Sequence, residues 1–477
     1  MGATHTPTNI LSSSEQRIWR QVLILALPSL AQQYLYLLVR LSDQYLADHF
    51  QLPDQTERPI YLSALTTAGY LYWFVSSYTI LVSVGATALV ARFVGAGDWQ
   101  LARQATGQSL LLAVGFGVLG TMAGLTGLPW LIEALQLTGN AGTYCIDFLT
   151  PLAILLAFQI TESACIACLA GAGDTQTGPK VLGLVAVLNV PLAWMLCFGI
   201  ASWKGMGFVG IAVGTGLAHV TGCIILLVML ARGRSGLKIR WAELVPNFRL
   251  FRRLLRVSVP AGIDSLSVAV CQLWFLGLVN HLGNTSAAAH GIAIQWEALG
   301  YLAGGAFGTA AMTLVGQNLG ARNPSRAARS VGAAFALGAG VMIAMGIAFV
   351  VLAVPMFRLF CHEEDSWPVI AEGVPVLQLI ACAMPALASQ IIFISALRGA
   401  GDTRVPIVIN WFGFLGVRIP LAYFLTRSSI DLGAIGVLPG WNLGLYGAWV
   451  AMCLDIWVRG TFFAIRFLSG KWKKVEV

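Results

Sequence analysis

Charged residues are scarce in this sequence. Asp, Glu, Lys and Arg make up only 10% of its 477 residues, whereas an ordinary soluble domain carries about 25%. Hydrophobic residues reach 57%, and the mean hydropathy is +0.76. Apolar runs of about 18 residues or more, separated by short polar loops, recur from Val22 to Leu468. This composition excludes a soluble globular protein and predicts a polytopic membrane protein.

Other features are missing as well. The nine cysteines lie mostly inside the apolar runs, so neither a disulfide framework nor a zinc site is indicated. Residues 1–20 are polar and lack the short apolar core of a cleavable signal peptide. The glycine-rich turns lack the Lys-Ser/Thr pair of a nucleotide-binding loop, and no metal or nucleophile motif suggests an enzyme. We therefore expect no cofactor and no enzymatic activity.

About twelve membrane-spanning helices are predicted. In lipid every backbone polar group must be paired internally, and long runs without strict alternation favour helices over a barrel. The predicted spans are residues 22–46, 62–89, 105–128, 144–169, 180–201, 207–231, 257–281, 287–314, 329–356, 371–396, 404–426 and 441–468. The expected fold class is therefore an all-α polytopic membrane protein.

The 29 basic residues indicate the orientation. With the N-terminus in the cytoplasm, most of them fall in cytoplasmic segments, and only Arg58, Lys204, Arg358 and Arg427 fall outside. An even number of spans returns the C-terminus to the same side. The net charge of +8 then reflects topology and contact with anionic lipid rather than nucleic-acid binding. We predict an integral protein of the inner or plasma membrane with both termini cytoplasmic.

A repeat divides the chain into two halves. Residues 169–175 (Leu-Ala-Gly-Ala-Gly-Asp-Thr) return 228 positions later as residues 397–403 (Leu-Arg-Gly-Ala-Gly-Asp-Thr). Pro191 aligns with Pro420 at an offset of 229, and Pro28 aligns with Pro260 at 232. Six helices per half give both halves one orientation, so the two lobes should be related by an axis along the membrane normal.

The expected organisation has five segments. They are a cytoplasmic N-terminal segment (1–21), a six-helix lobe (22–231), a basic cytoplasmic linker (232–256), a second six-helix lobe (257–468) and a cytoplasmic tail (469–477). The linker is either an amphipathic connector whose arginines sit at anionic headgroups or a plain loop that fixes the topology.

Three sequence elements resemble a known family. They are Leu-x-Gly-Ala-Gly-Asp-Thr after the fourth and tenth spans, residues 313–321 (Thr-Leu-Val-Gly-Gln-Asn-Leu-Gly-Ala), and residues 189–194 (Asn-Val-Pro-Leu-Ala-Trp). In this order they look like the multidrug and toxic compound extrusion (MATE) family. The resemblance implies two six-helix lobes that form a V-shaped cleft. It also implies export of cationic or amphipathic compounds against an inward flow of sodium ions or protons.

Ionisable groups inside the first six spans are candidate coupling residues, because each is costly in lipid. The resemblance implies that Asp43 takes part in cation or proton coupling, and the alternative is an ion pair with Arg40 one turn away. Glu162 aligns with Gln390 at the offset of 228, and Asn189 offers a neutral oxygen. If Asp43, Glu162 and Asn189 converge, they make a cation site of hard oxygen ligands, such as a Na+ site.

The second half offers Asp264 and Glu297 as coupling candidates. One branch of the family that the chain resembles couples sodium through an acid deeper in the seventh span, where this chain has Val268. Asp264 lies one turn earlier and is expected near the membrane surface. Glu297 stands where many relatives show an acid, and a coupling role and a structural role both fit it. Arg418 needs a partner, which Asp455 or Glu297 would supply.

The duplicated turns are interpreted as structural fixtures. Glycines permit tight turns and close helix contacts, while the aspartates accept backbone N–H bonds with help from the threonine hydroxyls. The residues of these fixtures are Gly171, Gly173, Asp174, Thr175, Pro191, Gly399, Gly401, Asp402, Thr403 and Pro420, and Arg418 is grouped with them.

Aromatic side chains are expected to line a cleft between the lobes, where they would suit flat organic cations. The alternative is packing against lipid. The candidates are Tyr34, Tyr36, Tyr72, Trp73, Trp274 and Trp296. Two histidines in spans, His219 and His290, are interpreted as hydrogen-bonded packing residues rather than proton relays.

Together these features predict a secondary active efflux transporter. It would export organic cations or amphipathic drugs by antiport with Na+ or H+, through alternating access of two lobes, and would function as a monomer. The alternative is a flippase of related fold for lipid-linked precursors, which should show a more cationic cavity and extra spans. An intramembrane enzyme is a third hypothesis, which the absence of a metal or nucleophile motif disfavours.

Overall fold

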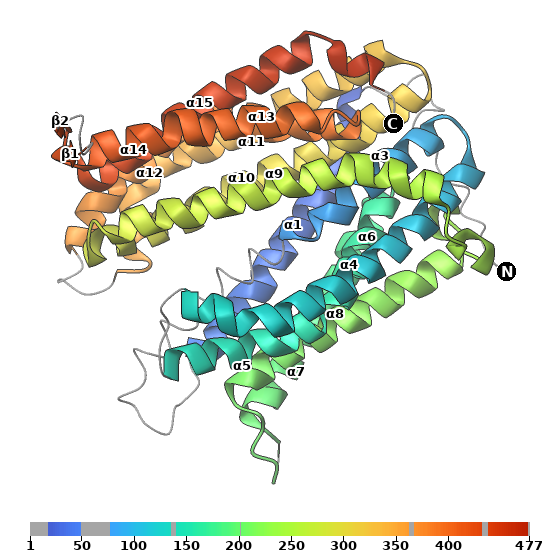
Figure 1. Cartoon of the computed structure of the whole chain (residues 1–477), viewed down its shortest axis with the longest axis horizontal. Helices are drawn as coiled ribbons and strands as arrows, with labels where there is room; N and C mark the ends of the chain where they lie inside the picture. Colours follow the sequence, from blue (N-terminus) through green and yellow to red (C-terminus); the bar gives the residue numbers. More distant parts are fainter. Residues whose placement is uncertain are drawn as a thin grey trace.

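The computed structural model describes residues 18–48, 77–134, 140–200, 202–361, 367–431 and 437–475, which are almost entirely helical (Figure 1). Most of the predicted second span, including the cleft candidates Tyr72 and Trp73, lies outside the described residues.

The helices follow the predicted spans. Those of the first half are α1 (Ile18–Asp48), α3 (Ile80–Gly95), α4 (Trp99–Ala134), α5 (Asn140–Ile154), α6 (Leu156–Gly171), α7 (Thr177–Phe198) and α8 (Phe208–Ala231). Those of the second half are α9 (Phe248–Asn280), α10 (Asn284–Gly320), α11 (Pro324–Arg358), α12 (Trp367–Gly399), α13 (Arg404–Trp411), α14 (Ile419–Thr426) and α15 (Gly444–Leu468). Within the described ranges, ten helical stretches are long and apolar enough to cross a membrane, the bent pair α5–α6 makes an eleventh, and α3 is a shorter apolar helix. Each of the twelve predicted spans overlaps one of these helices.

Two predicted spans are interrupted. The fourth is bent by 51° at Leu155, between α5 and α6, four residues after Pro151, whose ring lacks an N–H and crowds the preceding turn. The eleventh contains a π-helical turn (Phe412–Arg418) between α13 and α14. Such turns are rare and frequently occur at functional sites.

The connection between the halves is shorter than the predicted 232–256 linker. The side chain of Asn247 accepts the backbone N–H groups of Arg249 and Leu250 and starts α9 at Phe248. Residues 232–247 contain only two 3₁₀ turns, η2 (Arg234–Gly236) and η3 (Trp241–Leu244). The sequence also did not predict a small antiparallel hairpin, β1 (Ser429–Asp431) with β2 (Val437–Pro439), in which Ser429 pairs with Pro439.

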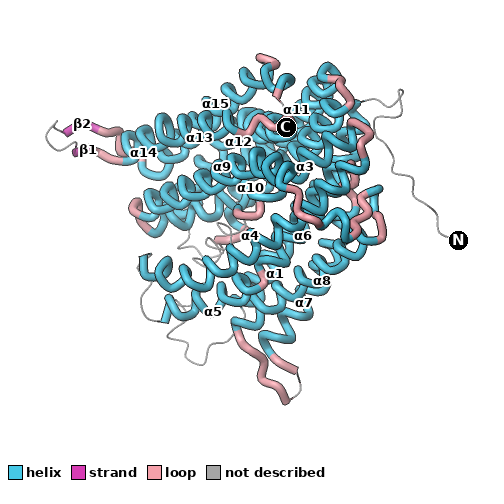
Figure 2. Tube along the Cα trace, turned by 45° about the vertical axis from the view of Figure 1, so that its right-hand side comes forward, coloured by secondary structure: helices cyan, strands magenta, loops and turns pink. Residues whose placement is uncertain are grey.

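The helices form two bundles, which approach each other at one end and spread apart toward the other in a V-shaped arrangement (Figures 1 and 2). Helices α1 and α3–α8 belong to the N-lobe, and α9–α15 belong to the C-lobe. The end at which the lobes meet carries residues 232–247 and the 3₁₀ turn η7 (Lys471–Lys474), and we call it the linker end; the β-hairpin lies at the opposite end (Figure 1).

The first part of α1 packs in the core of the C-lobe, and the first part of α9 packs in the core of the N-lobe. Val22, Leu25 and Ala26 of α1 are buried in the C-lobe core. Leu254 and Ala261 of α9 are buried in the N-lobe core. The N-terminal parts of α1 and α9 therefore join the two lobes.

Glycines bring α3 and α10 into backbone contact at the linker end. A Cβ atom at Gly95 would lie 2.0 Å from the Gln317 carbonyl oxygen, and one at Gly320 would lie 2.0 Å from that of Arg92. The Thr313 hydroxyl donates to the Ala170 carbonyl at 3.1 Å, and the Gln317 amide donates to that of Gly171 at 3.0 Å. The two lobes are thus closely joined at this end in this conformation.

Candidate functional site

Asp43 lies in a polar cluster formed by α1, α7 and α8. Its Oδ2 accepts a hydrogen bond from the Thr215 hydroxyl at 2.7 Å, and the same hydroxyl oxygen accepts the Asn189 amide at 2.8 Å. The Ser42 hydroxyl donates to the Asn189 amide oxygen at 3.2 Å. The other carboxylate oxygen of Asp43, Oδ1, is buried and has no hydrogen-bond partner in the part of the chain that the structure describes.

Glu162 and His219 form a buried pair beside this cluster. Glu162 Oε2 lies 2.6 Å from His219 Nδ1, and the two residues are 1% and 5% exposed. The ring of Tyr36 stacks near the imidazole, with 6.4 Å between centroids. Glu162 Oε1 is buried and has no partner within the described ranges. The absent side chain of Gly222 leaves room for it, because a Cβ there would lie 2.5 Å away.

The two N-lobe groups are neighbours because Thr215 and His219 are one turn apart on α8. Asp43 and His219 lie within electrostatic range of each other. The structure thus joins Asp43 and Asn189 through Thr215, and it places Glu162 in the adjoining pair rather than among the same contacts.

Sequence reasoning did not include Thr215 and Ser42 in this site and interpreted His219 as a packing residue. The available signal was the spacing of Thr215 and His219, four positions apart in the mostly apolar α8. His290 does behave as a packing histidine, because it is buried and accepts the indole N–H of Trp449 at 3.1 Å. Among the described residues, no group of three or more His, Cys, Asp and Glu side chains could hold a metal ion.

The C-lobe contains an ion-pair network centred on Asp455, which is fully buried. Asp455 accepts two hydrogen bonds from Arg459, at 2.8 and 2.6 Å, and one from Arg418 at 2.9 Å. Arg418 also donates to Gln272 at 2.8 Å. Both guanidinium groups lie over the ring of Phe414, at 4.8 Å for Arg418 and 4.2 Å for Arg459. Asp455 is therefore the partner of Arg418.

The same network contains Asp264. Its side chain is fully buried among the helices. Its Oδ2 accepts from Arg398 and its Oδ1 accepts from Asn410, both at 2.7 Å. Asn410 in turn accepts from Arg459 at 3.2 Å. A position deep among α9, α12 and α13 follows from these bonds, since an unpaired carboxylate there would be strongly destabilising.

Glu297 is half-buried on α10. Among the described residues it has no hydrogen-bond partner, but it lies within electrostatic range of Arg418. The network contains three arginines and two aspartates, whereas the carboxylate of Glu297 makes no direct ion pair with any of these arginines in the described structure.

The aromatic candidates do not form one cluster. Tyr34 donates weakly to the Leu299 carbonyl at 3.5 Å, which links α1 to α10. Tyr36 packs in the N-lobe, whereas Trp274 and Trp296 pack against the C-lobe core. The indole N–H of Trp296 is buried and has no hydrogen-bond partner in the described ranges.

The aspartates of the two duplicated turns each bind an arginine. Asp174 accepts from Arg234 at 3.0 Å, and Asp402 accepts from Arg466 at 2.9 and 2.7 Å. Asp174 also caps α7 by accepting the backbone N–H of Thr177 at 3.0 Å. The Thr175 hydroxyl was expected to contribute to this cap, but it does not. It donates instead to the Ile24 carbonyl of α1 at 3.4 Å.

Burial would raise the pKa of Asp174, which lies in the turn between α6 and α7. Hydrogen bonds from Ser235 and Thr177 and the charge of Arg234 oppose this effect, and together they hold its pKa below the ordinary value of an aspartate. Asp174 is therefore an ionised anchor between the turn and the 232–247 connection.

A comparison with known protein families matches each of the two halves of the chain. The MatE family model matches residues 28–195 and 260–424. A probable multidrug resistance protein NorM of Thermotoga maritima is 28% identical over 466 residues, which cover 96% of this chain and 94% of the relative. A probable multidrug resistance protein YoeA of Bacillus subtilis is 23% identical and covers 92% and 94% of the two chains.

Two solved structures have the same fold. One is an outward-facing multidrug resistance MATE family transporter, with a TM-score of 0.84, 18% identity, and coverage of 99% of this chain and 100% of that chain. The other is a transporter of the MOP superfamily from Pyrococcus furiosus, described as having a binding pocket of reverse polarity, with a TM-score of 0.85, 18% identity, and coverage of 96% and 97%.

Proposed function

The chain belongs to the MatE family, and we propose that it is a secondary active exporter of organic cations or amphipathic compounds, driven by antiport with Na+ or H+. It is an integral membrane protein, and its curated relatives are named as multidrug resistance proteins. The proposal adds the driving force, the substrate chemistry and the conformational cycle.

One observation carries the antiport proposal. Asp43 Oδ1 is buried in the N-lobe and has no hydrogen-bond partner among the residues described, beside a Thr215 and Asn189 pair that already satisfies Oδ2. A buried carboxylate oxygen without a donor is costly unless a proton or a cation neutralises it. Exchange of that proton or Na+ between the two sides of the membrane would supply the coupling.

The C-lobe offers a contrast at the corresponding position. At the offset of 229 that relates Pro191 to Pro420, Asn189 corresponds to Arg418. The Arg418 guanidinium is a permanent cation that already neutralises Asp455 together with Arg459. We therefore assign the mobile ion to the N-lobe and a structural role to the C-lobe network, which includes Asp264.

The proposed charge of the substrates follows from the ionisable side chains that are not already held in an ion pair. The arginines of the C-lobe network are engaged by aspartates, whereas Glu297 is half-buried and has no hydrogen-bond partner in the described structure. A carboxylate attracts organic cations through the Coulomb interaction.

Alternating access would proceed by separation of the lobes at the linker end. In this conformation the α3–α10 contact closes that end, and the bundles spread apart at the other. We assign the linker end to the cytoplasm because the connection and the tail are rich in Arg and Lys. One chain contains both lobes, so a monomer would suffice.

The test is transport by purified protein in proteoliposomes. A fluorescent organic cation is supplied, and a sodium gradient and a proton gradient are imposed separately. Accumulation driven by one gradient supports the antiporter and identifies its ion. If folded protein responds to neither gradient but moves a lipid-linked sugar across the bilayer, the flippase hypothesis replaces this one.

A further inference from the structure

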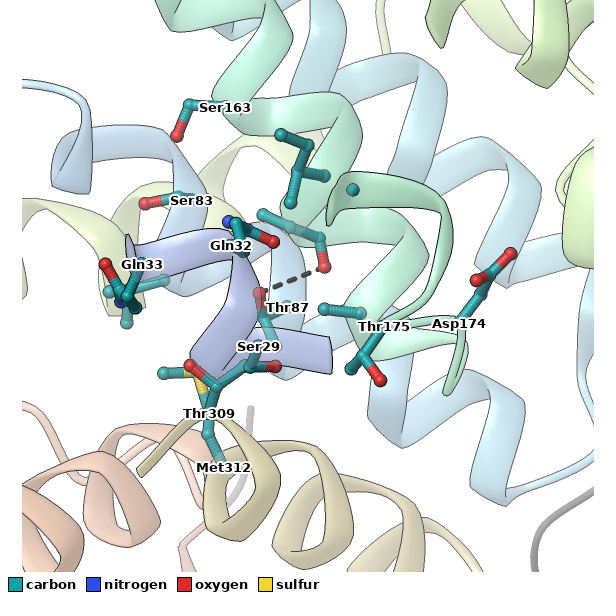
Figure 3. Close-up of a pocket in the computed structure, with 15 residues that line it drawn as sticks. Ser29, Gln32, Gln33, Ser83, Thr87, Ser163, Asp174, Thr175, Thr309 and Met312 are labelled. Carbon is teal, nitrogen blue, oxygen red and sulfur yellow. Dashed lines mark hydrogen bonds between the residues drawn. The ribbon is translucent and has the colours of Figure 1, made fainter. Parts of the chain in front are cut away.

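A polar cavity lies where the two lobes meet, and its lining does not include Asp43, Glu162 or His219. Its volume is about 190 Å³, and it lies between α1, α3 and α6 of the N-lobe and α10 of the C-lobe (Figure 3). The polar side chains around it are Ser29, Gln32, Gln33, Ser83, Thr87, Ser163, Thr175 and Thr309, with Asp174 at its edge.

Three of these side chains have unused hydrogen-bonding capacity. Gln32, Gln33 and Ser163 line the cavity, are half-buried, and have no hydrogen-bond partner in the described structure. The hydroxyls of Ser29, Thr87 and Thr309, in contrast, donate to backbone carbonyls of Leu25, Ala167 and Gly305. Each free amide or hydroxyl can both donate and accept a hydrogen bond.

No free charge faces the cavity from its lining. Among the described residues that line it, Asp174 is the only ionisable one, and Thr177, Arg234 and Ser235 already engage its carboxylate. In Figure 3 its side chain points away from Gln32 and Gln33. The cavity thus differs in chemistry from Asp43 and Glu162, which carry unpaired carboxylate oxygens.

The volume limits the size of the occupant. Pockets for drug-sized ligands measure about 300–1,000 Å³, so about 190 Å³ accommodates part of such a molecule. We propose that this cavity is a subsite for the uncharged, hydrogen-bonding part of a transported amphipath, such as a sugar or a hydroxylated ring. It would add selectivity that the acidic residues cannot provide.

The subsite requires both lobes. Gln33 lies beside α10, where a Cβ at Gly305 would be 3.5 Å from its amide nitrogen, and Thr309 and Met312 close the C-lobe side. It exists as a unit only while α10 lies against α1 and α3. Occupation of the subsite should therefore favour this arrangement of the lobes.

Equilibrium binding to the full-length protein in detergent tests the proposal. The probes are doxorubicin, an amine that carries hydroxyl, carbonyl and sugar groups, and tetraphenylphosphonium, a cation without hydrogen-bonding groups. In Gln32→Leu and in Gln33→Leu the ratio of the doxorubicin Kd to the tetraphenylphosphonium Kd should rise about three- to tenfold, as expected for loss of one uncharged hydrogen bond.

Gln378→Leu is the matched control, because Gln378 is exposed on α12, away from the cavity. It should leave the ratio unchanged. An unchanged ratio in both cavity variants, or no doxorubicin binding by the wild type, overturns the subsite. The subsite deepens the proposed export function, but binding does not depend on a gradient, so the two can fail separately.

Discussion

At the scale of residues, the two lobes treat buried carboxylates differently. In the N-lobe, Asp43 and Glu162 each retain one buried oxygen without a partner among the described residues. In the C-lobe, Asp264 and Asp455 have both oxygens engaged by Arg or Asn side chains. We propose that the first arrangement accepts a mobile cation, whereas the second already contains permanent ones.

The C-lobe network predicts an order of stability effects. Asp455→Asn leaves Arg418 and Arg459 both without a counter-charge, whereas Arg418→Gln leaves Asp455 still paired with Arg459. Removal of one partner of a buried ion pair costs about 3–5 kcal/mol, so Asp455→Asn should lower the thermal unfolding temperature more than Arg418→Gln. The exposed Arg256→Gln serves as the control. Equal unfolding temperatures for Asp455→Asn and the wild type would contradict the network's structural role.

Asp174 predicts a stability difference that depends on pH. Its pKa is lower in the folded protein than the ordinary aspartate value, so its contribution is complete above that value and is lost as the pH falls through the folded pKa. At pH 7 the wild type should be more stable than Asp174→Asn, by about 1.5–3 kcal/mol for hydrogen bonds to a charged group. The difference should shrink below about pH 4. Thermal unfolding of both proteins from pH 7 to pH 3 checks this, and a constant difference would contradict it.

At the scale of elements, the sequence predicted the helices well because each span is a long apolar run. It could not predict the bend at Leu155 or the π turn at Phe412–Arg418, because both depend on how a proline-containing helix packs. The start of α9 at Phe248 was missed because its first turns are basic, and the span was judged by hydropathy.

The site was only partly predictable. An ionisable residue in an apolar span is visible in the sequence, as Asp43, Glu162 and Asp264 were. Which of them retains a free oxygen depends on partners distant in the chain, such as Thr215 for Asp43 and Arg398 for Asp264. Those pairings come from the tertiary structure and leave no local pattern in the sequence.

The contact between α3 and α10 gives a prediction for a glycine. In Gly95→Ala the added methyl would collide with the Gln317 carbonyl, so the helices must separate at the linker end. Gly332→Ala on α11 meets no atom within 4 Å and is the matched control. Hydrogen-exchange mass spectrometry should show faster exchange in the last turns of α3 and α10 for Gly95→Ala alone. Unchanged exchange in those turns would show that the contact does not hold the lobes together.

At the scale of the whole molecule, the orientation can be tested with two native lysines. Lys238 lies in the connection at the linker end, Lys204 lies between α7 and α8, and both are exposed. A membrane-impermeant amine reagent applied to spheroplasts or intact cells should modify Lys204 and not Lys238, and both should react after permeabilisation. Modification of Lys238 in sealed cells would reverse the proposed orientation.

The pseudo-symmetric architecture joins two lobes of unequal chemistry. The repeat relates the duplicated turns, and each turn aspartate binds an arginine, Arg234 or Arg466. In the same repeat, Asn189 of the N-lobe cluster and Arg418 of the C-lobe network occupy equivalent positions. A common scaffold thus supports one lobe with unpaired carboxylate oxygens and another whose carboxylates are neutralised by arginine.

The most direct test of the account compares Asp43→Asn with Asp147→Asn in the proteoliposome assay. Asp147 is an exposed carboxylate on α5. Both variants therefore lose one acid, but only Asp43→Asn removes a buried carboxylate oxygen. We predict that Asp43→Asn lowers gradient-driven accumulation of an organic cation at least about tenfold, as loss of a group worth about 1.4 kcal/mol or more requires, while Asp147→Asn matches the wild type. Wild-type accumulation by Asp43→Asn, at equal insertion in the bilayer, would contradict the assignment of the mobile ion to the N-lobe.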